Sequence, residues 1–123
     1  MERVLGKFSP YFYGLLRIVA GVLFAFHGAQ KLFGMFGGRQ MPLVSQFGLA
    51  GGIELVCGLL IAIGLLTSLA AFLASGEMAA AYFIAHYPQG PIPIQNGGEL
   101  AVLYCVLFLY IASRGTVALG IKR

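Results

Sequence analysis

Four apolar segments, each close to the length that a bilayer crossing requires, dominate this sequence. A membrane-spanning helix needs about 20 mostly apolar residues, and the segments cover about 11–33, 47–66, 68–87 and 98–113. Because a helix in lipid satisfies its own backbone hydrogen bonds, helices are the expected structure of such segments. The sequence therefore predicts an all-α fold: one transmembrane domain over residues 1–123, built as an antiparallel four-helix bundle.

The composition favours lipid as the solvent of this chain. Hydrophobic residues make up 59% of the sequence and charged residues 10%, whereas soluble domains are about a quarter charged. A soluble chain of this length could not bury so much apolar surface. The net charge of +4 comes from scattered residues and not from a basic stripe, so nucleic acid is not an expected partner. Cys57 and Cys105 lie in apolar runs without a CxxC motif and are expected to pack as small hydrophobes.

The basic residues predict the orientation in the membrane. Those near the chain ends or after the fourth segment are Arg3, Lys7, Arg114, Lys122 and Arg123, and those on the other side are Lys31 and Arg39. Because cytoplasmic flanks carry the excess of lysine and arginine, both termini are expected in the cytoplasm and both longer loops outside. We expect the first segment to be a true span and not a cleaved signal peptide, since it is long and contains Arg17 and His27.

The breaks between the segments indicate how the helices connect. "GMFGGRQMPLVSQ" is rich in glycine and contains Pro42, which predicts a loop or an interfacial segment. "LLTSL", around Thr67, is so short that the second and third helices should form a tight hairpin. "YPQGPIPIQNGG" cannot continue a helix and is expected to cap the bundle on the side of the first loop.

A stripe of cationic, small and aromatic residues runs down the first segment. Arg17, Gly21, Phe24, Gly28 and Lys31 follow one another at steps of three and four, which places them on one helix face. Small residues on such a face let a neighbouring backbone approach closely. The stripe is therefore expected to face the interior of the bundle.

Three carboxylates lie in or beside the later apolar segments, where an unpaired charge is costly. We expect Arg17 to pair with Glu77, and Lys31 to pair with Glu99 or Glu54. Glu77 and His86 are nine residues apart, about 180° around an ideal helix. They can both point inward only if the third helix bends or ends before His86.

Each of these residues has a plain structural interpretation beside the functional one. Arg17 with Glu77 would be a structural ion pair, His27 a packing or metal-binding histidine as well as a proton carrier, and His86 an interfacial side chain. Glu99 would be a first-turn acid favoured by the helix dipole. No helix carries the Glu-x-x-His pattern of di-metal bundles, so no metal site is predicted.

Several motifs resemble those of the DoxX family of small four-helix membrane proteins. The resemblance covers roughly 17–115 and rests on "RIVAGVLFAFHGAQKLFG", "GGIELVCGLLIAIGL" and "GEMAAAYFIAHYPQGPIPIQNGGELAVLY". Its positions in the last stretch include Glu77, His86, Asn96 and Glu99. The tail "RGTVALGIKR" departs from the family's glycine-rich Ser-Leu-Asp ending.

The resemblance implies a multi-pass protein of a bacterial inner membrane, related to the membrane subunit of a thiosulfate:quinone oxidoreductase. The expected function is that of a redox-linked subunit that binds a quinone or similar lipophilic molecule in the outward-facing half of the bundle. His27, Glu54, Glu77 and Glu99 would handle protons, and Arg17, Lys31, His86 and Asn96 would bind.

The sequence encodes no electron carrier, so a soluble redox protein partner or an external donor would be required. A homo-oligomer is compatible with such a subunit. The alternative is a non-enzymatic scaffold or assembly partner that holds soluble redox or oxidative-stress enzymes at the membrane. A third, weaker alternative is a pathway for protons or small solutes, although no broken-helix pattern marks a substrate site.

Overall fold

The computed structural model describes residues 1–38 and 45–121, and these residues form helices and no strand. The long helices are α2 (Ser9–Phe33), α3 (Gln46–Ile63), α4 (Thr67–Ala81) and α6 (Glu99–Arg114); the short ones are α1 (Glu2–Leu5), η1 (Gly6–Phe8), the π-helical turn η2 (Tyr82–His86), η3 (Tyr87–Gln89) and α5 (Pro93–Asn96). The predicted all-α class is confirmed for this part of the chain. Arg39, Pro42, Lys122 and Arg123, which entered the predictions of loops and orientation, lie outside the described residues.

Within residues 1–38 and 45–121, three helical runs are long and apolar enough to cross a membrane: Glu2–Phe33, Gln46–Ile63 and Thr67–Gln89. At 16 residues, α6 is shorter than these runs. Between a third and a half of the residues in the most apolar 18-residue stretch of each run are buried inside the protein. The remaining apolar side chains face outward, as lipid-facing residues do.

The ends of α2 and α3 follow from local chemistry. Pro10 stands in the first turn of α2, where its missing N–H is not needed. The Ser45 hydroxyl accepts a hydrogen bond from the Gly48 N–H (3.0 Å) at the start of α3. Gly34 and Gly64 end the two helices with φ of 68° and 83°, a conformation that glycine adopts without strain. The expected extension of the second helix to residue 66 is therefore wrong.

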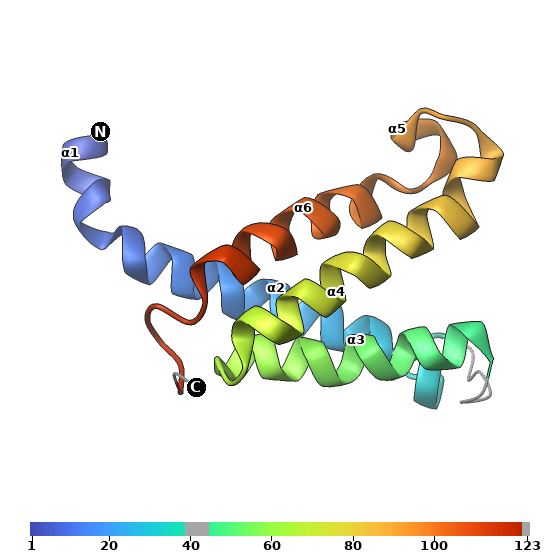
Figure 1. The fold of residues 1–123 in the computed structure, drawn as a ribbon, viewed down its shortest axis with the longest axis horizontal. Coiled ribbons are helices and arrows are strands. Elements are labelled where there is room, and N and C mark those ends of the chain that lie inside the picture. The colour runs from blue at the N-terminus through green and yellow to red at the C-terminus, as the bar shows by residue number, and fades with distance from the viewer. Residues whose placement is uncertain (39–44, 122–123) are drawn as a thin grey trace.

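The long helices form two pairs. α2 packs along α3, α4 packs along α6, and the pairs are joined through α3 and α4. In Figure 1, α3 and α4 meet at the turn between them and diverge from there, with α1 and the tail after α6 on the side where they meet. We call this end, with Arg17, the Gly64–Leu66 turn and the Gly115–Ile121 tail, the closed end. The opposite end, with Lys31, Glu54 and His86, is the open end.

Glycine makes the contact between α2 and α3 unusually close. A Cβ on Gly21 would lie 2.6 Å from Ala62 N and 2.6 Å from Gly58 O, and a Cβ on Gly58 would lie 2.6 Å from Ala25 N. No side chain fits at such distances, so the two backbones touch directly. The predicted inward-facing stripe is confirmed, since Arg17, Gly21, Phe24 and Gly28 are buried.

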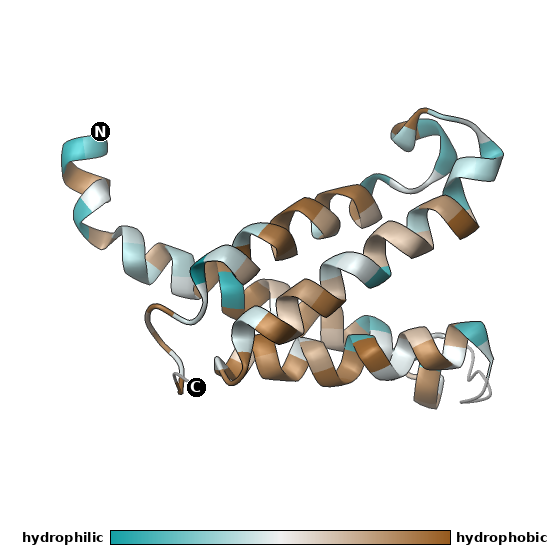
Figure 2. Cartoon of the chain, viewed as in Figure 1, coloured by the Kyte–Doolittle hydropathy of each residue, from teal (hydrophilic) through white to brown (hydrophobic). Residues whose placement is uncertain are grey.

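An aromatic cluster fills the space between the two pairs. Phe24 of α2 lies 4.7 Å from Phe108 and 5.4 Å from Tyr104, both of α6, measured between ring centroids. Tyr104 and Phe108 stack at 5.2 Å. Figure 2 shows hydrophobic residues along all four long helices, and many of the large ones are exposed, which suits a protein surrounded by lipid. The core thus joins the two pairs through aromatic contacts between α2 and α6.

Candidate functional site

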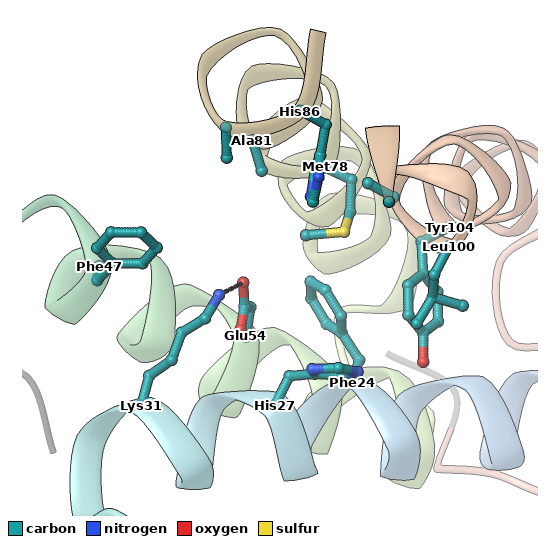
Figure 3. Close-up of a pocket in the computed structure, with 13 residues that line it drawn as sticks. Phe24, His27, Lys31, Phe47, Glu54, Met78, Ala81, His86, Leu100 and Tyr104 are labelled. Carbon is teal, nitrogen blue, oxygen red and sulfur yellow. Dashed lines mark hydrogen bonds and ion pairs between the residues drawn. The ribbon is translucent and has the colours of Figure 1, made fainter. Parts of the chain in front are cut away.

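A cavity of about 360 Å³ lies at the open end, between the two helix pairs. Figure 3 shows side chains converging on it from all four long helices and from η2. Its lining includes Phe24, His27 and Lys31 of α2, Phe47 and Glu54 of α3, Met78 and His86 on the α4 side, and Leu100 and Tyr104 of α6. Cavities that hold small molecules have about 300–1,000 Å³ and are mostly apolar with a few polar groups. This cavity has both properties.

An ion pair between Lys31 and Glu54 forms the charged wall of the cavity. Lys31 Nζ donates to Glu54 Oε2 at 2.6 Å, and the glutamate side chain is 1% exposed. The pairing depends on the close approach of α2 and α3, because a Cβ on Gly51 would lie 2.8 Å from Lys31 Cβ. Of the two partners expected for Lys31, Glu54 is confirmed.

A second carboxyl group, that of Glu77, lies beside Glu54 in this wall. Glu54 Oε1 and Glu77 Oε1 are buried and have no hydrogen-bond partner among the described residues. Glu77 lies near enough to interact with both Glu54 and Lys31. One ammonium group therefore faces two carboxyl groups, which also interact with each other.

The π-helical turn η2 explains how His86 reaches the cavity although it follows Glu77 by nine residues. α4 ends at Ala81, and the wider turn that follows carries His86 to the cavity, while Glu77 lines an adjacent hollow. Single π turns interrupt α-helices often at functional sites. His86 Nδ1 lies 3.2 Å from the Asn96 carbonyl oxygen, which can only accept, so Nδ1 carries the proton. Nε2 is then an acceptor.

Asn96 organises the loop above the cavity and does not line it. Its Nδ2 donates to Tyr82 Oη (3.1 Å) and to the Gly90 carbonyl (2.7 Å), and its Oδ1 accepts from the Gly98 N–H (2.8 Å). The side chain is 3% exposed. Asn96 therefore holds the chain between η2 and α6 in place, and its effect on a ligand would pass through His86.

His27 stands on the opposite wall and contacts the ring of Tyr104 edge to face, with centroids 6.2 Å apart. It lines the cavity and also a second hollow between α2 and α6, together with Phe26 and Leu100. Another hollow, of about 230 Å³, lies between α3 and α4 and shares Lys31 and Phe47 with the cavity. The cavity thus adjoins outward-facing hollows on two sides.

Arg17 is not part of this site, and its expected pairing with Glu77 is wrong. The guanidinium is fully buried at the closed end, where Nη1 donates to the carbonyls of Ile61 and Ala62 and Nη2 to those of Ala118 and Leu119. A helix leaves its last four carbonyls without partners, and two of those of α3 are met by this arginine. Arg17 therefore donates to these carbonyls and not to the carboxyl group of Glu77.

Glu99 also lies apart from the cavity. It is exposed in the first turn of α6 and borders a surface hollow with Ile92, Pro93 and Leu103. This placement fits the interpretation as a first-turn acid favoured by the helix dipole. The site thus gathers His27, Lys31, Glu54 and His86 around one cavity with Glu77 beside it, and leaves out Arg17 and Glu99.

The sequence analysis missed the aromatic residues of the cavity. Phe24, Phe47 and Tyr104 form much of its wall, but in a chain this apolar an aromatic residue carries no local signal of a ligand. Phe24 alone had a usable signal, its place on the stripe of the first helix. Among residues 1–38 and 45–121, no three His, Cys, Asp or Glu side chains are grouped so as to hold a metal ion.

Comparison with known proteins gives a family and one informative relative. The DoxX family model matches residues 13–87, more than half of the chain. An uncharacterized protein of Haemophilus influenzae is 44% identical over 121 residues, which cover 93% of this chain and 90% of the relative. No solved structure matches. The matched segment contains His27, Lys31, Glu54, Glu77 and His86, the acidic and basic residues at or beside the cavity.

Proposed function

The chain belongs to the DoxX family, and from that premise we propose that it is a redox-linked subunit of a bacterial inner membrane that binds a quinone or similar lipophilic molecule. The bound head group would occupy the cavity at the open end. The observation that carries this proposal is an apolar cavity of about 360 Å³ with an ion pair and two histidines in its walls. A lipophilic ring needs the apolar walls, and its oxygens need the polar ones.

In the proposed topology four antiparallel helices cross the bilayer, with both termini in the cytoplasm and the open end outside. The 16 residues of α6 give about 24 Å at ~1.5 Å per residue, most of a hydrocarbon core of ~30 Å. Arg3, Lys7 and Arg114 then flank the cytoplasmic face. The chain would act as a single transmembrane domain, alone or as a homo-oligomer.

The polar residues of the cavity have distinct proposed roles. Lys31 is placed to donate to a carbonyl oxygen of the ligand, since its ammonium group has donors beyond the one used by Glu54. His27, Glu54, Glu77 and His86 would exchange the protons that accompany electrons in quinone reduction, a general acid–base role. The electrons would come from a soluble redox protein or an external donor.

The first experiment is a native purification with identification of bound small molecules and proteins. We expect a lipophilic quinone to co-purify with the wild-type protein. Ala81→Phe, which projects a ring into the cavity, should purify without it, whereas Ala79→Phe on the same helix, outside the cavity lining, should retain it. A soluble enzyme recovered in equal amount, with no small molecule in any sample, would replace this proposal with the scaffold function.

A further inference from the structure

Lys31, Glu54 and Glu77 form a cluster of one base and two acids, which we call the charged cluster. Lys31 Nζ donates to Glu54 Oε2 at 2.6 Å, and the Glu54 side chain is 1% exposed. The carboxyl group of Glu77 hydrogen-bonds with that of Glu54 and also interacts with Lys31. The three residues belong to α2, α3 and α4, so the charged cluster connects the two helix pairs.

A hydrogen bond between two carboxyl groups requires a proton on one of them. An ionised carboxylate is only an acceptor, whereas a protonated carboxyl group has an O–H that donates. Two carboxylates that share one site do not both ionise readily, because their charges repel. The single ammonium group offsets one carboxylate, and a second charge in apolar surroundings is costly. Hydrogen bonding and charge balance therefore favour the same state of the cluster: one ammonium group, one carboxylate and one protonated carboxyl group.

The other titratable side chains around the charged cluster do not supply a second cation. Tyr104 of α6 and Cys57 of α3 interact with the two acids, but both titrate from neutral to negative. His27 and His86 line the cavity, and among the described residues no salt bridge joins either histidine to a carboxyl group. Lys31 is therefore the cation that the two acids share.

We propose that Glu54 and Glu77 hold one proton between them at neutral pH while Lys31 stays charged. Glu77 is the donor of the pair, because Lys31 already donates to Glu54. This inference rests on the proposed function for the use of the proton, and it adds where the proton is held before a ligand takes it up. Glu54 lines the cavity, Glu77 lines the hollow between α3 and α4, and Lys31 lines both. The stored proton thus lies directly beside the ligand cavity.

The test is infrared spectroscopy of the wild-type protein at neutral pH, in a detergent without ester groups. A protonated carboxyl group has a carbonyl stretch that a carboxylate lacks and that shifts in heavy water. We expect this band with the intensity of one carboxyl group per chain. Its absence would overturn the inference and leave the proposed function standing, since co-purification of a quinone is measured separately. The band in a protein that retains no small molecule would support the shared proton and count against the proposed function.

Two variants distinguish a shared proton from a carboxyl group that is protonated by burial alone. Glu77→Gln should lose the band, because Lys31 offsets the remaining carboxylate. Glu54→Gln should lose it as well, because Lys31 is then free to pair with Glu77, which ionises. A band that persists in a folded Glu54→Gln protein would refute the sharing of the proton.

A control keeps the test decisive if neither of these variants folds. The chain has four acidic side chains, and the two outside the charged cluster, Glu2 and Glu99, are exposed. Replacing both of these exposed acids with glutamine should leave the full band, which then comes from Glu54 and Glu77. Loss of the band in this double variant would assign the proton to an exposed acid and overturn the inference.

Discussion

At the closed end, Arg17 is fully buried and donates to four backbone carbonyls, whereas at the open end Glu54 is equally buried and only one of its oxygens is paired. Both residues carry ionisable groups that are buried in a largely apolar chain. The carbonyls around Arg17 belong to the last turn of α3 and to the tail. The hydrogen bonds of Arg17 therefore hold the tail against α3. The charge on Glu54 borders an open cavity.

The difference shows that α2 and α3 form a closed structure at one end and part of a cavity at the other. The remaining carbonyls of the last turn of α3 are also satisfied: Leu60 O accepts from the Gly64 N–H (2.9 Å) and Ile63 O from the Ile121 N–H (3.0 Å). Thr116 Oγ1 adds a bond to Gly64 O at 2.9 Å. The last four carbonyls of α3 are thus all paired within the protein. At the open end, Lys31 and the two neighbouring carboxyl groups of Glu54 and Glu77 interact beside the cavity.

The largest expected effect comes from Arg17→Met at the closed end. It strands carbonyls of α3 and of the tail without donors, so we expect the free energy of unfolding to fall by about 4 kcal/mol. Thermal unfolding of the purified protein in detergent measures the change. Arg3→Met, at an exposed position of α1, serves as the control and should leave the unfolding temperature unchanged. A tolerated Arg17→Met would show that the tail needs no anchor.

Gly21→Ala tests the close contact on which both ends depend. The added methyl would collide with backbone atoms of Gly58 and Ala62 and force α2 and α3 apart, at a cost of about 2–3 kcal/mol. Gly52→Ala is the matched control, because a Cβ there meets nothing within 4 Å. That control should keep or slightly raise stability, since alanine favours helix. Similar losses in both variants would contradict the contact.

Asn96→Ala sharpens the comparison at the open end. It removes three hydrogen bonds from the loop above the cavity, and we expect a loss of about 2 kcal/mol. The loss should appear in hydrogen exchange as faster opening of 87–98, while the amides of α3 near Arg17 keep their protection. Gln95→Ala, exposed beside it, should behave as wild type. Equal deprotection of both ends would show that they do not open independently.

The smallest effect, and one of opposite sign, is expected for Glu77→Gln. Replacing one of two neighbouring carboxyl groups that share a single lysine with a neutral amide, which can still donate to Glu54, should raise the free energy of unfolding by about 1 kcal/mol. Thermal unfolding beside Glu99→Gln, which should be neutral, provides the measurement. Destabilisation by Glu77→Gln would mean that the second carboxylate stabilises the fold and that the two ends handle charge alike.

Much of the fold could be predicted from the sequence. The apolar segments predicted helices that overlap α2, α3, α4 and α6, and the spacing of glycines predicted which face of α2 is buried. Helix ends were less accurate, because Gly64 stops α3 through its own backbone conformation and η2 replaces the last α-helical turn before His86. Local apolarity continues through both points, so the pattern alone could not reveal them.

The site was only partly predictable for a related reason. Lys31 with Glu54 was one of two stated pairings, and His27 and His86 were both named, but Arg17 and Glu99 were placed in the wrong surroundings. Helical spacing gives the face and the approximate depth of a residue. It does not say which backbone carbonyls are free in three dimensions, and these decided the partner of Arg17.

The sequence by itself determined that this protein is helical and suited to a membrane, and that a few ionisable groups lie in its apolar segments. These conclusions follow from composition and periodicity, which are properties of the chain alone. Only the tertiary structure decided which of those groups lie at the closed end and which lie at the open end. The helix pairs touch at the closed end and diverge from it, so the carbonyls at one end enclose an arginine. The same divergence leaves a cavity beside a half-paired glutamate at the other end.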